Sequence, residues 1–261
     1  METEIRTFRF YHYIKAEYVE DFLHTGRLKV TQLGHSNDYF EFRPGFSSPD
    51  VENEWKNTIQ GGEPCVICLT SRISSPVMWG HYGDKGKGVC LVFDIPIEKL
   101  FNPKYPNIYC VYDLRLPLGR VQYLQAQHII NMTPRLGSNE LIELTTTLAC
   151  IKAKDWEYEQ EYRLMIPERD LYAENGNLFY AGLRQYCSAI LLGWECPLTR
   201  LYMERVKTLC GITNMWILSA QPAKDKFEIC VCNLNEHDYS DTDGALLDAW
   251  VNGGFEHKTL R

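Results

Sequence analysis

The stretch from residue 156 to 166 carries the side chains of this sequence best suited to chemistry. It reads Trp-Glu-Tyr-Glu-Gln-Glu-Tyr-Arg-Leu-Met-Ile, with an acidic residue at every second position of its first half. In a β-strand this alternation predicts Glu157, Glu159 and Glu161 on one face, with Arg163 continuing that face. Neighbouring carboxylates repel, so the pKa of one of them can rise until it acts as a base near neutral pH.

Two other interpretations of this stretch remain open. Tyr158, Tyr162, Met165 and Ile166 also fall at helical spacing, and in a helix the glutamates are a solvated face. The three glutamates and a histidine could instead serve a metal-dependent hydrolase. No pair of histidines in the sequence stands at metal-ligand spacing, which disfavours a metal site.

A histidine among aromatic residues forms a second cluster. The sequence Phe-Tyr-His-Tyr at residues 10–13 predicts a strand in which His12 lies opposite Tyr11 and Tyr13. One of these faces could present a polar ring to a pocket. The alternative is a core strand whose histidine is hydrogen-bonded in the interior.

Hydroxyl residues that lead into an aromatic helix form a third cluster. Leu-Thr-Ser-Arg at residues 69–72 precedes Val-Met-Trp-Gly-His-Tyr at residues 77–82. Such a pattern suits stacking on a planar ligand, and it equally suits an ordinary packed helix.

The ten cysteines raise the question of a zinc site, because Cys65/Cys68 and Cys230/Cys232 are closely spaced pairs. Their flanking residues are apolar and typical of strands, whereas structural zinc pairs normally sit on turns. We therefore expect free thiols, mostly buried as small apolar side chains, and no bound metal.

Strands and helices must position these residues. Expected strands span residues 7–14, 27–30, 64–71, 88–95, 121–124, 156–164, 189–192, 214–219 and 227–232. Expected helices span residues 16–25, 75–82, 139–153 and 198–209. Residues 36–50 are rich in Gly, Pro, Ser and Asn, which predicts a long loop of the kind that often carries function.

These elements predict one α+β domain over residues 1–233, with mixed, mostly antiparallel sheets around a cleft and a C-terminal β-α-β-β segment. Residues 234–261 are expected to form a tail that could dock as a helix.

Charge and hydropathy exclude several classes of protein. The 27 basic and 34 acidic residues give a net charge of -7, which repels phosphate backbones and anionic membranes and disfavours a duplex-binding module. Apolar runs such as residues 189–194 are far shorter than the roughly 20 residues of a membrane span. The first residues lack the pattern of a signal peptide, so we expect a cytoplasmic protein with no membrane partner.

Several ordered motifs resemble a widespread bacterial family, domain of unknown function 2971, over roughly residues 8–232. The motifs are His-Tyr at 12–13, Ser-Asn-Asp-Tyr-Phe-Glu at 36–41, Met-Trp-Gly-His-Tyr at 78–82, Gly-Val-Cys-Leu-Val-Phe-Asp at 88–94 and Trp-Glu-Tyr-Glu-Gln-Glu-Tyr-Arg at 156–163. Tyr39 departs from the pattern, which favours Pro at that position. The family resemblance by itself implies no activity.

A more distant resemblance, to the ADP-ribosyltransferase superfamily, does imply chemistry. Those proteins begin with a strand ending in His or Arg, continue with a Ser/Thr strand and an aromatic helix, and end the site with a Glu-bearing strand. His12, Ser71, Tyr82 and the Glu-Gln-Glu sequence at 159–161 occur in that order. The resemblance favours a strand for the glutamates and implies that the strands of His12 and Glu161 share one cleft.

The resemblance also implies NAD as the substrate. Glu161 would stabilise the positive charge that develops as the nicotinamide bond breaks, Glu159 would position or deprotonate the acceptor, and His12 would bind a ribose hydroxyl. Nicotinamide would stack on Tyr82 or Tyr13. The further residues expected around NAD are Asn37, Asp38, Ser71, Arg72, Trp79, His81 and Arg163.

The function expected from this resemblance is transfer or hydrolysis of ADP-ribose, as in bacterial toxins and anti-phage effectors. The acceptor could be a protein or a nucleic acid, and the oligomeric state stays open. The alternative is a catalytically inactive module that senses a nucleotide or a phage component on the same fold.

Overall fold

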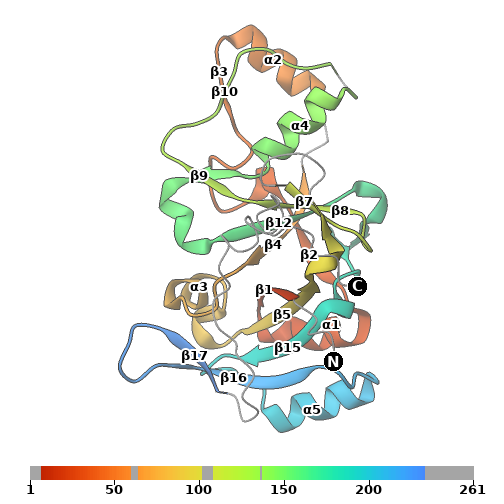
Figure 1. Cartoon of the computed structure of the whole chain (residues 1–261), viewed down its shortest axis with the longest axis vertical. Coiled ribbons are helices and arrows are strands. Elements are labelled where there is room, and N and C mark those ends of the chain that lie inside the picture. Colours follow the sequence, from red (N-terminus) through yellow and green to blue (C-terminus); the bar gives the residue numbers. More distant parts are fainter. Residues whose placement is uncertain (1–6, 60–63, 102–107, 136, 233–261) are drawn as a thin grey trace, which may run out of the picture.

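The computed structural model describes residues 7–59, 64–101, 108–135 and 137–232. The predicted tail over residues 234–261 lies outside these described ranges. The molecule is elongated, with a large sheet in its lower part and a smaller helical lobe at the top (Figure 1).

Thirteen strands of the described chain form the main sheet. They are β1 (Thr7–Ile14), β2 (Leu28–Gln32), β4 (Cys65–Thr70), β5 (Val89–Pro96), β6 (Leu100–Phe101), β7 (Ile108–Val111), β8 (Leu116–Arg120), β12 (Glu161–Ile166), β13 (Tyr172–Glu174), β14 (Asn177–Tyr180), β15 (Cys187–Leu192), β16 (Trp216–Pro222) and β17 (Ile229–Cys232). The order across the sheet is β17-β16-β15-β5-β1-β4-β12-β8-β7-β6, and β2, β14 and β13 branch from β4.

The remaining elements are short. Two parallel strand pairs lie outside the main sheet, β3 (Gly45–Phe46) with β10 (Ile129–Ile130), and β9 (Gln122–Leu124) with β11 (Ile151–Ala153). The α-helices are α1 (Val19–Thr25), α2 (Pro49–Thr58), α3 (Pro76–His81), α4 (Asn139–Leu148) and α5 (Arg200–Leu209). The 3-10 helices are η1 (Ala16–Tyr18), η2 (Leu33–His35), η3 (Asp84–Gly86), η4 (Ile97–Lys99), η5 (Lys154–Glu159), η6 (Glu168–Asp170) and η7 (Arg184–Tyr186).

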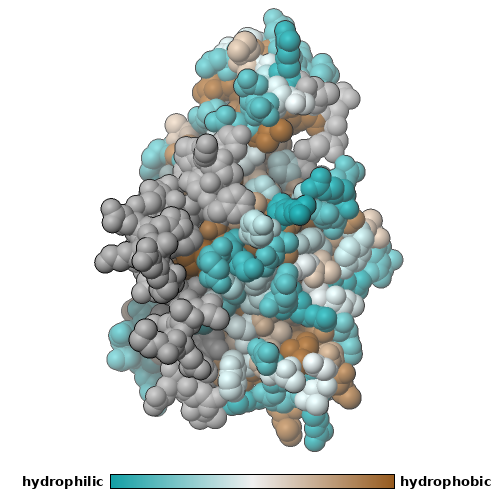
Figure 2. Space-filling view, turned by 45° about the vertical axis from the view of Figure 1, so that its right-hand side comes forward, coloured by the Kyte–Doolittle hydropathy of each residue, from teal (hydrophilic) through white to brown (hydrophobic). Residues whose placement is uncertain are grey.

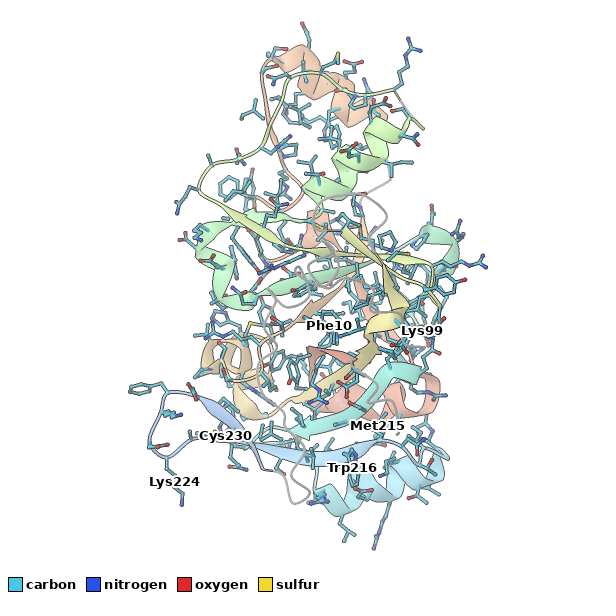
Figure 3. The ribbon with its side chains drawn as sticks, in the orientation of Figure 1. Phe10, Lys99, Met215, Trp216, Lys224 and Cys230 are labelled. Atoms are coloured by element: carbon cyan, nitrogen blue, oxygen red, sulfur yellow. The ribbon has the colours of Figure 1, made fainter. Side chains whose placement is uncertain are left out.

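The central strands are buried on both faces, which explains their nearly continuous apolar sequences. In β5, Leu91 and Phe93 face a core that α1 and α5 complete, whereas Cys90 and Val92 face a second core around Trp79 of α3. Phe10 of β1 lies inside the body, while Lys224 lies at the tip of the projecting β16–β17 hairpin (Figure 3).

The lobe at the top has its own small core. α2, α4, β3 and β10 gather there (Figure 1), and the buried residues include Phe42, Trp55, Ile130, Leu141 and Leu148. In the space-filling view, hydrophilic side chains cover much of the visible face and hydrophobic ones form separate patches (Figure 2). No helix in the described ranges has both the length and the apolar character needed to cross a bilayer.

The α+β class, the mostly antiparallel pairing and the C-terminal β-α-β-β segment are confirmed. Among the recorded pairs of the main sheet only β15 and β16 are parallel, and α5 is the crossover between them. The predicted strand over residues 7–14 coincides with β1, and the predicted helices at 75–82 and 198–209 lie within two residues of α3 and α5.

The strand predicted over residues 156–164 is wrong in its first half. Residues 154–159 form the 3-10 helix η5, and β12 begins only at Glu161. Gln160 between them has φ = 44°, a left-handed conformation that breaks the alternation. Helical spacing and strand alternation were both present in this sequence, and each describes one half of it.

Two further expectations need correction. The helix predicted over residues 139–153 ends at Leu148, after a run of three threonines whose β-branched side chains weaken helices, and residues 151–153 form β11. The loop predicted over residues 36–50 contains β3 and ends in α2, which begins with a Ser48 cap and Pro49.

Candidate active site

The ends of three adjacent strands line a cavity of about 340 Å³, here called the carboxylate pocket. β1 and β12 both pair with β4, where Tyr11 and Glu161 each lie opposite Thr70. β1 and β12 are therefore two strand spacings apart, roughly 10 Å. The predicted residues that line the carboxylate pocket are His12, Tyr13, Asn37, Tyr82, Glu159 and Glu161.

His12 is held in one tautomer by the neighbouring strand. Its Nδ1 lies 2.7 Å from the carbonyl oxygen of Cys68, and because a carbonyl only accepts, Nδ1 carries the proton. Burial lowers the pKa of His12 and favours the neutral ring. The Nε2 atom is therefore left as a hydrogen-bond acceptor.

Lys152 joins three buried carboxylates at the floor of the carboxylate pocket. Its Nζ lies 2.6 Å from Glu159, 3.0 Å from Glu41 and 3.5 Å from Glu161. All four side chains are at most 6% exposed, so little solvent screens these ion pairs. The aromatic ring of Trp156 lies 4.7 Å from Nζ and covers the same cation.

Arg163 is the second buried cation and lies behind Glu161. Its Nε and Nη2 donate to the two oxygens of Glu161, each at 2.9 Å, and Nη2 also pairs with Glu41. Its Nη1 donates to the carbonyl of Ala149 at the end of α4, at 2.7 Å. Arg163 thus fixes both the carboxylate of Glu161 and the end of a helix.

The two glutamates of the Glu-Gln-Glu sequence differ in their protonation. Burial alone would raise the pKa of Glu161, but the charges of Arg163 and Lys152 lower it to about 2. Burial and then the negative charge of Glu161 raise the pKa of Glu159. Glu161 is therefore a fixed negative charge, and Glu159 is the carboxylate better suited to exchange a proton.

Tyr82 connects Glu159 to the rim of the carboxylate pocket. Its hydroxyl donates to Glu159 and accepts from the Nδ2 of Asn37 at 3.3 Å. Burial, followed by the hydrogen bond to Glu159, raises the pKa of Tyr82, so the phenol stays protonated. Thr70 ties the backbone of this region together by donating to the carbonyl of Glu159.

The structure places several other predicted residues away from the pocket lining. Trp79 is fully buried, packs on Tyr13 and Trp194, and donates to the carbonyl of Ile73, so it belongs to the core. His81 is exposed and bonds the hydroxyl of Tyr158. The other predicted residues that do not line the pocket are Asp38, Ser71, Arg72 and Arg163.

Arg72 and Asp38 nevertheless lie close to residues of the pocket. The hydroxyl of Tyr13 donates to the carbonyl of Arg72 at 3.4 Å, which places the exposed Arg72 beside a pocket residue. One oxygen of Asp38 caps the backbone N–H of Phe40, and the other is buried with no hydrogen-bond partner in the described chain.

Sequence reasoning missed two charged residues of the site, Glu41 and Lys152. Glu41 lies in the motif at residues 36–41 without a predicted chemical role, and Lys152 lies within the helix expected over residues 139–153. No local signal marked Lys152, because a lysine between Ile151 and Ala153 in a short strand is expected to face solvent, whereas the structure buries it.

No group of three His, Cys, Asp or Glu side chains in the described ranges has a geometry that could hold a metal ion. The two cysteine pairs cannot share a zinc ion, because Cys65 lies in β4 and Cys230 in β17. Five strand steps separate β4 from β17, roughly 24 Å. Burial raises the pKa of Cys68, so its thiol is neutral.

Comparison with known proteins adds one family. Residues 78–164 match the model of a protein family of unknown function, DUF2971. This match supports the family resemblance drawn from the motifs, over that part of the chain. The matched range contains most of α3, Lys152, Glu159 and Glu161, whereas His12 and Glu41 precede it. No curated protein and no solved structure matches the chain.

Proposed function

We propose that the protein binds NAD or a related nucleotide in the carboxylate pocket and transfers or hydrolyses its ADP-ribose. The observation that carries this proposal is an excess of negative charge. Three carboxylates, Glu41, Glu159 and Glu161, meet two cations, Lys152 and Arg163, around one cavity. When all five groups are ionised, the cluster keeps one net negative charge.

A negative charge of this kind suits cleavage of a glycosidic bond. As the bond between the ribose carbon and nicotinamide breaks, the electron pair leaves with nicotinamide and positive charge develops on the ribose. A fixed carboxylate stabilises that charge more than it stabilises the ground state. Glu161 has this property because it stays ionised, and Arg163 holds it in place.

Glu159 would handle the proton of the incoming nucleophile. Water or an acceptor group attacks the ribose carbon and gives up a proton as the new bond forms. A carboxylate with a raised pKa accepts that proton near neutral pH. Tyr82 and Lys152, which both bond Glu159, would keep it oriented toward the carboxylate pocket.

The remaining groups suit a nucleoside. Nε2 of His12 can accept the hydrogen of a ribose hydroxyl, because Nδ1 is committed to the backbone. Tyr13 and Tyr82 line the carboxylate pocket and offer aromatic surface to the nicotinamide ring. Arg72, beside Tyr13, is the cation that we assign to the phosphates.

A nicotinamide-release assay tests the proposal. Wild type should consume NAD, and Glu161→Gln should reduce turnover by about a hundredfold or more, because the neutral amide cannot stabilise the developing charge. Glu159→Gln should impair transfer to an acceptor while leaving slow hydrolysis. Glu157→Gln is the matched control, since Glu157 is exposed and pairs only with the exposed Lys154 among described residues.

Melting temperature and NAD affinity are measured on each variant, because Glu161 is buried against a cation and its loss can weaken the fold. Undiminished turnover in Glu161→Gln would end this mechanism. A wild-type protein that binds NAD without consuming it, with equal affinity in all variants, would favour the inactive binding module.

A further inference from the structure

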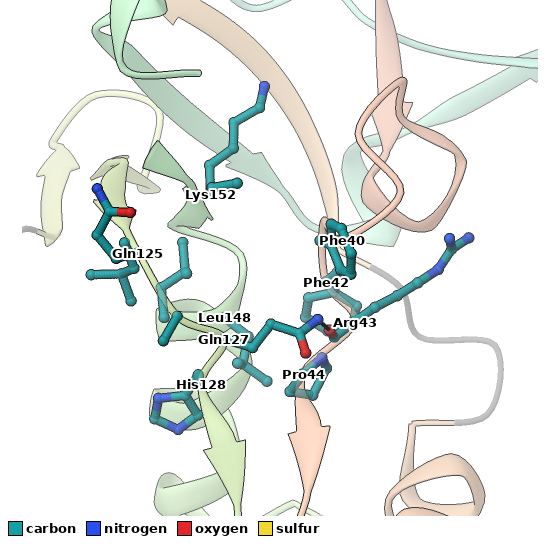
Figure 4. Close-up of a pocket in the computed structure, with 13 residues that line it drawn as sticks. Phe40, Phe42, Arg43, Pro44, Gln125, Gln127, His128, Leu148 and Lys152 are labelled. Carbon is teal, nitrogen blue, oxygen red and sulfur yellow. Dashed lines mark hydrogen bonds between the residues drawn. The ribbon is translucent and has the colours of Figure 1, made fainter. Parts of the chain in front are cut away.

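A second cavity, here called the aromatic pocket, lies between two segments far apart in sequence. Residues 40–44 and 124–128 run toward the parallel strands β3 and β10, and they enclose a volume of about 310 Å³ (Figure 4). The N–H of Gly45 donates to the carbonyl of His128 at 2.9 Å and holds the two segments together.

The walls of the aromatic pocket are apolar and partly open. Phe42 and Leu148 are buried in the core of the lobe, and Ile151 adds a third apolar side chain. Phe40 is 54% exposed although it lines the cavity, so its ring is available to a ligand. A planar aromatic ligand would bury its apolar faces between these side chains, which favours its binding.

One side of the aromatic pocket can form hydrogen bonds. Gln125, Gln127 and His128 line it along one segment, opposite Phe40, Phe42 and Pro44 (Figure 4). Gln127 donates to the carbonyl of Arg43, whereas the amide of Gln125 has no hydrogen bond to any other described residue. An amide both donates and accepts, which matches the edge of a nucleobase.

The charges around the aromatic pocket favour an anionic ligand. None of its thirteen lining residues is acidic, although the chain has a net charge of -7. Arg43 is among them, with two N–H groups bound to the carbonyls of Tyr39 and Gly34 and further donors on the same guanidinium. The Arg43 guanidinium points away from Gln125 and His128 (Figure 4), so a phosphate that extends from the base past Phe42 would meet this cation, and no lining residue is acidic.

We infer that the aromatic pocket binds the base of a nucleotide, as a second site beside the carboxylate pocket. Lys152 lines both cavities, and its amine points away from Gln127 and His128 toward its carboxylate partners (Figure 4). Glu41, Glu159 and Glu161 line only the carboxylate pocket, so a nucleotide in the aromatic pocket meets a different set of side chains. This inference does not require the proposed function.

Calorimetric titration of the full-length protein with the four nucleoside 5′-monophosphates tests it. At least one should bind, and ribose 5-phosphate should bind at least tenfold more weakly, because it lacks the base that stacks. Ala126→Trp should abolish binding, since Ala126 is an exposed lining residue and the indole would fill the cavity. Gln125→Ala should weaken binding about fivefold through the lost hydrogen bond.

Two control variants keep the result interpretable. Ala173→Trp places the same indole on the exposed strand β13, outside the lining of the aromatic pocket, and should leave affinity unchanged. Glu157→Gln, at an exposed residue that lines neither cavity, should also retain binding of the monophosphate. Absence of binding by all four nucleotides would overturn the inference, as would equal binding by Ala126→Trp or by ribose 5-phosphate. NAD turnover is measured in a separate assay, so failure of nucleotide binding in the aromatic pocket and failure of the proposed function can be told apart.

Discussion

The lowered pKa of Glu161 predicts that the stability of the fold depends on pH. This pKa falls from 4.5 to about 2 on folding, so ionised Glu161 stabilises the fold above its ordinary pKa. That contribution, about 3 kcal/mol, should be lost as the pH falls from about 4.5 toward 2. In Glu161→Gln the free energy of unfolding should start lower and vary less with pH in this window, as measured by urea denaturation. An equally steep loss in Glu161→Gln and in the control Glu157→Gln would contradict it.

The backbone conformation of Gln160 determines the turn between η5 and β12, and substitutions at this residue test its importance for stability. Gln160 joins η5 to β12 in a left-handed conformation, φ = 44°, and this turn aims Glu159 and Glu161 at the same lysine. Gln160→Val should lower the free energy of unfolding by about 2 kcal/mol, because a β-branched residue is strained there. Gln160→Gly, which tolerates this φ, should stay near wild type in urea denaturation. Equal loss in both variants would mean that the side chain matters more than the turn.

Buried ion pairs between different elements join the lobe to the main sheet. Glu41 comes from the segment that enters the lobe, Lys152 from β11 and Arg163 from β12. Glu41→Leu removes a partner of both Lys152 and Arg163, and Lys152→Met leaves three buried carboxylates with Arg163 as their one cation, so each should cost about 3 to 5 kcal/mol. The double variant should cost less than the sum, with a coupling of at least about 1 kcal/mol by urea denaturation. The exposed pair Glu157–Lys154 should couple by less than about 0.5 kcal/mol in the same cycle.

The sequence by itself determined the elements whose signals are local. β1 and β5 follow from short runs of apolar and aromatic residues, and α3 follows from Ser75 and Pro76, which suit the start of a helix; these signals act within a few residues of chain. The sequence also predicted that Glu159 and Glu161 face the same site. The predicted cause was partly wrong, because a turn and not a continuous strand brings the two carboxylates together.

Only the tertiary structure decided which charges meet. Glu41 and Arg163 are 122 residues apart in the chain, and no local pattern encodes their contact. The chain buries these charges only because partners from different elements neutralise one another, and that compensation exists only after the sheet and the lobe have assembled. The burial of Trp79 was likewise decided by tertiary contacts. The sequence suggested a ring that binds a ligand, whereas in the fold β5 and β15 cover Trp79 and make it a core residue.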